Sequence, residues 1–221
     1  MSTILAGTDA LSGPALYALL RSTSGDLLDL QAHRRQFRVD YLTASRTGRF
    51  GFGKLEAGQR FQEPDSIAWR AFADGRVRDA LAENERRRDE LTAYAAQTAA
   101  AGIQSRRARV VTGPLDPYLL WELDLLRIRD ELGLRTRVID LGAHPNLGRP
   151  EDYPEVVTIG DHLAYWLLYS PGGLQTGSVR FDDPGVIRQA QATTVALYDR
   201  GEPVSDFFAR KVAPRLQAKY P

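Results

Sequence analysis

Two arginines and one glutamate in the middle of the chain could bind an anion or transfer a proton. Arg107 and Arg109 lie two positions apart in an apolar segment, and Glu122 directly follows Trp121 in a leucine-rich segment. Guanidinium groups form paired hydrogen bonds with carboxylates and phosphates, and a carboxylate in apolar surroundings can serve as a general base. Because burying Glu122 without a partner would cost several kcal/mol, we expect one of the two arginines to bind it and keep it ionised.

The segment that carries these residues predicts a strand, a Gly-Pro corner and a helix over residues 107–133. Asp116 suits the N-cap of this helix, and Pro117 suits its first turn. Thr112 and Gly113 follow the strand at its carboxyl end, where open α/β sheets bind ligands and where helix N-termini favour anions. Both are therefore candidate binding residues.

Aromatic and titratable residues extend the candidate site. Tyr118 and Trp121 lie beside the glutamate on the predicted helix and are candidate binding residues. Asp161 and His162 are neighbours at the start of a later strand, which also carries Tyr165, and these are further candidate residues. His162 is a candidate general base, so the two catalytic candidates are Glu122 and His162. The simpler interpretation of the Asp-His pair is a turn between two strands. The simpler interpretation of the Arg-Glu pair is likewise architectural, in which it only fixes the helix on the sheet.

The order of elements around this segment predicts an α/β fold. A strand over 105–113, a helix over 117–132 and a strand over 134–142 form a βαβ unit, which requires parallel pairing and a right-handed crossover. Three short strands follow, and a Pro-Gly-Gly turn joins the last two into an aromatic hairpin. We therefore expect a mixed sheet with a βαβ unit and an aromatic hairpin, flanked by helices.

Outside this region the patterns are less regular. Residues 1–36 predict a helical N-terminal extension, 37–200 the main α/β domain, and 201–221 a C-terminal helix packed on it. The glycines of residues 37–61 predict strands joined by tight turns, with "GFGK" as a turn, because the Walker pattern needs a longer glycine spacing and a Ser or Thr after the lysine. Residues 77–101 predict one long helix with a solvated charged face.

Composition excludes several classes of protein. Lys and Arg number 29 against 28 for Asp and Glu, so no overall field attracts the molecule to nucleic acid or an anionic membrane. The chain has no cysteine and only three histidines, which leaves little for a metal site, and we expect no cofactor. Neither a signal peptide nor a bilayer-spanning apolar run is apparent, so the expected location is cytoplasmic.

The stretch "RARVVTGPLDPYLLWEL" resembles an actinobacterial domain of unknown function whose members are often encoded beside helix-turn-helix regulators and small partner proteins. The resemblance covers roughly residues 37–200, and its core maps onto Arg109, Pro114, Leu115, Tyr118 and Glu122. The order of elements is also similar to one half of a phospholipase D-like fold. None of the histidines has a lysine two residues later, so the His-x-Lys chemistry of that superfamily is not expected.

Two functional hypotheses follow. The first is a ligand- or partner-binding domain in a bacterial regulatory circuit, which binds a small anionic ligand in its candidate site, or a partner protein through the aromatic hairpin or the N-terminal helices. The alternative is a transferase or hydrolase acting on a phosphorylated, nucleotide or aminoacyl-tRNA substrate, in which case RNA becomes a partner. The glycine- and proline-rich loop 142–154 serves either as a lid or as a connection.

Overall fold

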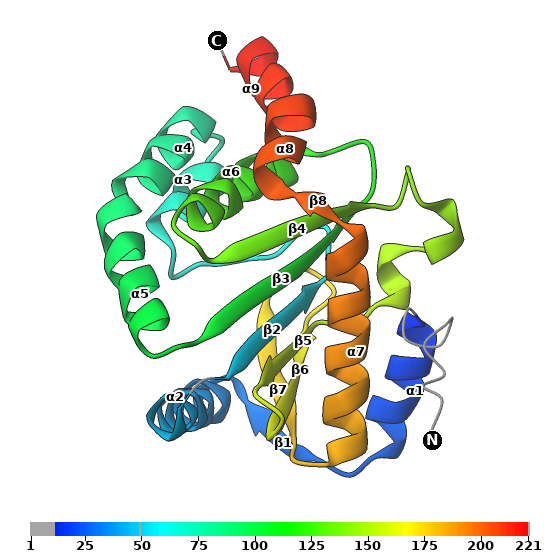
Figure 1. The fold of residues 1–221 in the computed structure, drawn as a ribbon. Coiled ribbons are helices and arrows are strands. Elements are labelled where there is room, and N and C mark those ends of the chain that lie inside the picture. Colours follow the sequence, from blue (N-terminus) through cyan, green and yellow to red (C-terminus); the bar gives the residue numbers. More distant parts are fainter. Residues whose placement is uncertain (1–11, 49, 221) are drawn as a thin grey trace.

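A single mixed sheet forms the centre of the protein (Figure 1). The computed structural model describes residues 12–48 and 50–220. In this part of the chain eight strands pair in the order β1-β7-β6-β5-β2-β3-β4-β8. Only β2, β3 and β4 are mutually parallel, and the remaining pairs are antiparallel. The strands are β1 (Asp26–Asp29), β2 (Gly51–Glu56), β3 (Gln104–Val111), β4 (Arg135–Asp140), β5 (Val156–Ile159), β6 (Leu163–Tyr169), β7 (Gln175–Phe181) and β8 (Glu202–Pro203).

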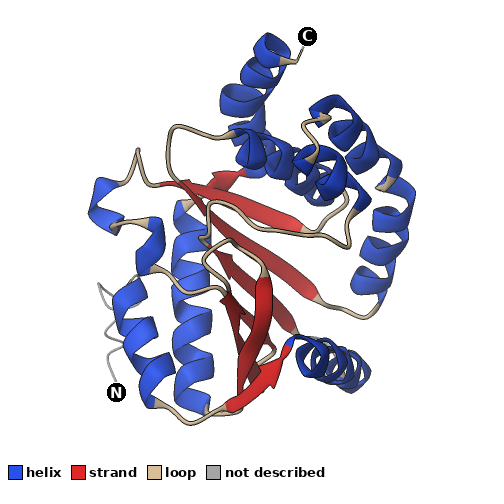
Figure 2. Cartoon of the chain, turned by 180° about the vertical axis from the view of Figure 1, so that it is seen from behind, coloured by secondary structure: helices blue, strands red, loops and turns tan. Residues whose placement is uncertain are grey.

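Helices cover both faces of this sheet (Figure 2). One face carries α1 and α7, and the other carries α2 together with the group α3 to α6 and α8. No helix in the described ranges has the length and apolar character that crossing a bilayer requires. The helices are α1 (Gly13–Ser22), α2 (Leu30–Thr47), α3 (Ile67–Ala73), α4 (Val77–Arg86), α5 (Arg88–Ala100), α6 (Pro117–Glu131), α7 (Pro184–Arg200), α8 (Val204–Phe207) and α9 (Ala213–Lys219).

The predicted βαβ unit is confirmed as β3, α6 and β4. Its two strands are parallel and in direct register, with Val110 opposite Ile139. Asp116 caps α6, since its Oδ1 accepts the Leu119 N–H at 2.9 Å. Successive residues of a strand point to opposite faces, so Val110 packs beneath α7 whereas Val111 packs beneath α6. Both faces of this unit are therefore buried, as parallel sheets require.

The N-terminal region differs from the prediction. Asp26–Asp29 forms an edge strand against β7, and α2 occupies residues expected to form strands. Its apolar residues Phe37, Tyr41 and Ala44 recur at helical spacing and pack against the sheet. The expected boundary at residue 37 thus lies inside α2, and residues 1–11 of the predicted extension lie outside the described part.

Two other elements differ from their predicted form. "GFGK" forms the first four residues of β2 rather than a turn, because Gly51 to Glu56 pair with β3 on one side and Phe52 to Leu55 pair with β5 on the other. The long helix expected over 77–101 is two helices that meet at Arg87. The C-terminal helix is likewise divided into α8, a π-helical turn and α9, whose first turn contains a proline.

Candidate functional site

The helices on the α2 and α6 face leave the middle of the sheet uncovered. One group packs on β5 and β6 beneath α2, where Val157 and Tyr165 are buried. The other packs on β3 and β4 beneath α6 and α8. Between the two groups, alternation along the strands places Lys54 and Glu56 of β2 and Arg107 of β3 on this face. The central strands thus carry charged side chains where sheets usually carry apolar ones.

These charged side chains form the floor of a cavity of about 350 Å³, which we call the charged cleft. Helix α6 supplies one wall through a stripe at helical spacing, and the segment after β2 and the ends of β6 and β7 supply the others. The cleft adjoins a wider hollow of about 750 Å³ between α2 and α4, the outer hollow, with which it shares four lining residues. The cleft is lined by Lys54, Glu56, Phe61, Gln62, Glu63, Arg87, Arg107, Glu122, Leu125, Leu126, Arg129, Tyr169 and Gln175.

Glu56 binds the two cations of the floor. The residue is 4% exposed, and its carboxylate pairs with Lys54 Nζ at 2.5 Å and with an Arg107 terminal nitrogen at 2.7 Å. Burial alone would raise the pKa of Glu56, but Arg107, Lys54 and Arg109 together hold it well below its usual range. Glu56 is therefore a fixed negative charge that neutralises one of the two positive charges of the floor.

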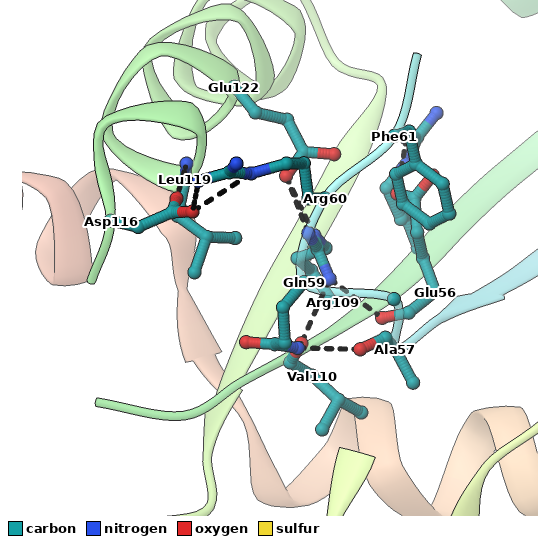
Figure 3. A network of polar contacts seen from close by, with 12 residues as sticks. Glu56, Ala57, Gln59, Arg60, Phe61, Arg109, Val110, Asp116, Leu119 and Glu122 are labelled. Atoms are coloured by element: carbon teal, nitrogen blue, oxygen red, sulfur yellow. Dashed lines mark hydrogen bonds and ion pairs between the residues drawn. The ribbon is translucent and has the colours of Figure 1, made fainter. Parts of the chain in front are cut away.

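The arginine that binds Glu122 is Arg109, which lies beneath the lining of the charged cleft (Figure 3). Arg109 is fully buried, and its Nε and one terminal nitrogen donate to Glu122 Oε2 at 3.0 and 2.6 Å. The other terminal nitrogen donates to the carbonyls of Glu56 and Val110 at 3.3 and 2.9 Å. Every terminal group of this guanidinium is thus bound by protein, so Arg109 holds α6 on the sheet rather than facing the cleft.

Glu122 itself can exchange a proton near neutral pH. Both Arg109 bonds end on Oε2, while the residue lines the charged cleft. Burial raises the pKa of Glu122 to about 7, against the opposing effect of Arg109. The ion pair with Arg109 favours the ionised carboxylate, and burial opposes it. A proton donor or acceptor at the edge of a cavity is chemically competent for acid-base work.

Arg129 is one of the cleft residues that the sequence patterns missed. It lies two helical turns after Glu122 on the same face of α6 and lines the cleft. Among the described residues no carboxylate forms an ion pair with it, and its guanidinium carbon lies 5.9 Å from the centre of the Tyr94 ring. Burial, and then the nearby Arg107, lowers the pKa of Arg129 to about 10. This cation has lost much of its hydration without gaining a protein counter-ion.

The aromatic candidates are core residues. Tyr118 and Trp121 are fully buried, and Trp121 stacks on Phe72 with ring centres 5.5 Å apart. Neither the Tyr118 hydroxyl nor the Trp121 Nε1 has a hydrogen-bond partner within the described part of the chain. Tyr165 is also buried, and its hydroxyl bonds Asp40 of α2. These rings contribute packing, and they line neither the charged cleft nor the outer hollow.

The structure separates the remaining candidates from the cleft. Asp161 and His162 pair with each other at 3.0 Å in an exposed turn between β5 and β6, beyond the pairing of Ile159 with Phe52 near the start of β2. Thr112, whose N–H donates to a glutamine side chain at 3.0 Å, and Gly113 lie past the end of β3. The corner before α6 already holds the Arg60–Asp116 ion pair, with 2.5 Å between its charged atoms.

A further buried carboxylate, Glu155, borders a separate cavity of about 440 Å³ beyond the end of β2. Its Oε1 accepts the N–H groups of Ala57 and Gly58 at 2.7 and 2.6 Å, whereas its buried Oε2 has no partner among the described residues. Burial, and then the negative charge of Glu56, raises the pKa of Glu155 to about 7.

Replacing Glu155 by glutamine should reduce the pH dependence of stability. Because the folded pKa lies above the unfolded value of 4.5, the proton on Glu155 stabilises the fold fully below about pH 4.5, and this contribution is lost as pH rises through about 7. Relative to the parent protein, Glu155→Gln should therefore be more stable at about pH 8 than at about pH 5. Urea unfolding at both pH values measures this, with the exposed Glu151→Gln as control. An equal difference at the two pH values would contradict the prediction.

The fold and the cleft define a mixed α/β domain with a charged cavity in the middle of its sheet. The chain belongs to the family described as a domain of unknown function (DUF6879), whose model matches residues 41–209. No curated protein and no solved structure matches the chain. The matched segment contains all thirteen residues that line the charged cleft.

Proposed function

We propose that this protein binds a small anionic ligand in the charged cleft and does so within a bacterial regulatory circuit. The observation that carries the proposal is Arg129, a largely desolvated guanidinium without a counter-ion among the described residues. Desolvating a charge is costly unless it is paired. An incoming carboxylate or phosphate would supply that pair, and the planar guanidinium would bind either group through two hydrogen bonds.

The surroundings of Arg129 favour the same ligand. Arg107 lies close enough to lower its pKa, and so does Arg87, which lines the cleft where α4 meets α5. Two of the lining carboxylates are engaged by protein, since Glu56 binds Lys54 and Arg107 and Glu122 binds Arg109. An anion entering the cleft would therefore meet positive charge that the floor does not neutralise.

The regulatory setting comes from the resemblance to domains encoded beside helix-turn-helix regulators. In this proposal the ligand acts as a signal, and a partner protein reads it out. The likeness to half of a phospholipase D-like fold is retained as a proposal about ancestry alone. Its chemistry is not proposed, because His33, His144 and His162 are not followed by lysine two residues later.

The proposal predicts that Arg129→Gln loses anion binding without losing stability. Inorganic phosphate and acetate, titrated calorimetrically, should bind the parent protein at least about tenfold more tightly than the variant, since a hydrogen bond to a charged group contributes roughly 1.5–3 kcal/mol. The unliganded variant should be at least as stable as the parent, because an unpaired cation has been removed from the interior. Arg149→Gln, at an exposed site, is the control.

An opposite result is easy to recognise. Unchanged phosphate and acetate affinities, together with a marked loss of stability in Arg129→Gln, would make Arg129 a structural residue. The anion-binding proposal would then fail.

Glu122 favours an enzyme as the second candidate function. A carboxyl with a pKa of about 7 beside a cluster of arginines could take a proton from a bound phosphorylated, nucleotide or aminoacyl-tRNA substrate. In that case Glu122→Gln would abolish turnover while leaving ligand affinity within about twofold. His162 cannot share this role at the cleft, because it lies in the β5–β6 turn and is not one of the lining residues.

A further inference from the structure

The charged cleft contains a second unpartnered charge, of opposite sign to Arg129. Glu63 lines both the charged cleft and the outer hollow. No described residue forms an ion pair or hydrogen bond with its carboxylate, although its backbone carbonyl accepts the Ser66 N–H at 2.8 Å. Burial raises the pKa of Glu63, more than the lysine and arginines around it lower it.

The backbone around Glu63 is held firmly. Gln62 donates its backbone N–H to the Gly173 carbonyl at 2.9 Å and its side-chain amide to the Gly172 carbonyl at 2.9 Å. On the other side, Phe61 packs against Tyr169 with ring centres 4.9 Å apart. The segment is therefore fixed to the β6–β7 turn, and the free carboxylate is not the result of a loosely attached loop.

The other charges of the cleft have protein partners. Lys54 and Arg107 share Glu56, and Glu122 binds Arg109. Within the described part of the chain, this leaves Arg129 and Glu63 as lining residues with opposite charges and no ion pair, and they do not pair with each other. Each is partly desolvated, so a ligand that pairs with only one of them would leave the free-energy cost of desolvating the other charge uncompensated.

We propose that the ligand is a small zwitterion whose anionic group binds Arg129 and whose ammonium group binds Glu63. This inference rests on the proposed anion-binding function and adds the second charge to the ligand. A cation at Glu63 would form charge-assisted hydrogen bonds with a carboxylate that burial has partly desolvated. The outer hollow, which shares Glu63 with the cleft, leaves about 750 Å³ for a further substituent of the ligand.

Matched ligand pairs that differ only in the ammonium group test the inference. Calorimetric titration of the full chain would compare phosphoethanolamine with ethyl phosphate, and the ω-amino acids from glycine to 6-aminohexanoate with the corresponding carboxylates. The parent protein should bind the best zwitterion about tenfold more tightly than its matched anion. Glu63→Gln should remove this preference and leave the affinity for ethyl phosphate unchanged or slightly higher. Glu151→Gln, at an exposed site outside both cavities, is the control.

The outcomes separate the two proposals. If ethyl phosphate binds in an Arg129-dependent manner, but the ammonium group adds no affinity, the zwitterion inference is overturned and the anion-binding function stands. If no anion or zwitterion binds, both are overturned. If nucleoside monophosphates are preferred through Glu63, and the ammonium pairs show no preference, Glu63 recognises a base amino group and the zwitterion inference is again overturned.

Discussion

Arg109→Met is expected to lower the free energy of unfolding by about 3–5 kcal/mol, because it leaves Glu122 as an uncompensated buried charge. Arg109 is fully buried and supplies both hydrogen bonds to Glu122 Oε2. It also bonds the Glu56 and Val110 carbonyls, which lose their donor in the variant. Guanidinium chloride unfolding followed by circular dichroism would measure the change. The loss should be larger at about pH 8 than at about pH 5, since protonation lets the isolated carboxyl remain buried.

The double variant Arg109→Met/Glu122→Leu separates the ion pair from simple packing. Replacing both partners by apolar groups of similar volume is often neutral or stabilising, so the double variant should regain most of the lost stability. A double variant as unstable as the sum of the two single variants would show that the Arg109–Glu122 pair is not the source of the effect. The exposed pair Arg34–Asp65, with side chains 61% and 76% exposed, provides the control, since its removal should change stability by less than about 1 kcal/mol.

Trp121→Ala is expected to cost about 3–5 kcal/mol, the range for removing a large aromatic side chain from a core. Trp121 is fully buried and contacts Phe72 and Tyr118 with ring centres 5.5 and 5.6 Å away. Trp121→Phe keeps an aromatic ring and removes the Nε1 group that has no partner in the described part of the chain. Its loss of stability should therefore be less than half of the loss in Trp121→Ala. Thermal and denaturant unfolding would rank the variants.

The same variants decide whether Trp121 has a role in binding. Trp121 does not line the charged cleft, so Trp121→Phe should bind phosphate with the parent affinity. A loss of affinity in a variant that remains folded would return Trp121 to the binding site and contradict its assignment to the core.

The sequence predicted those features that depend on local signals. Gly, Pro and Asp at fixed positions marked the βαβ unit, and a glutamate on an apolar stripe required a partner. Local patterns did not distinguish Arg107 from Arg109 as that partner, because both lie on the same face of β3. Their different roles depend on β2. Arg107 binds the carboxylate of Glu56, which belongs to this neighbouring strand and lies 51 positions earlier in the chain.

The missed residues share one property, which is that their environment comes from distant parts of the chain. Lys54 lies among glycines that suggested a turn, and only its pairing with β3 and β5 makes it a central strand residue. Arg129 looks like an ordinary solvent-facing helix residue, and only the fold places it beside Tyr94 of α5 and Arg107 of β3. A usable signal was present in the strands: Lys54 and Glu56, like Arg107 and Arg109, are charged at alternating positions, which marks a buried sheet face that a helix does not cover.

The family match begins at residue 41, inside α2, whereas the packed elements of the fold begin earlier. Strand β1 completes the edge of the sheet beside β7, and the first half of α2 contributes Leu30 and Arg34 to the outer hollow. His33 and Phe37 of that half cover Tyr165, with ring centres 5.5 and 5.3 Å away. A protein cut to the shared segment would therefore expose an apolar sheet surface and self-associate, so recombinant work on relatives should retain the sequence that corresponds to α1, β1 and all of α2.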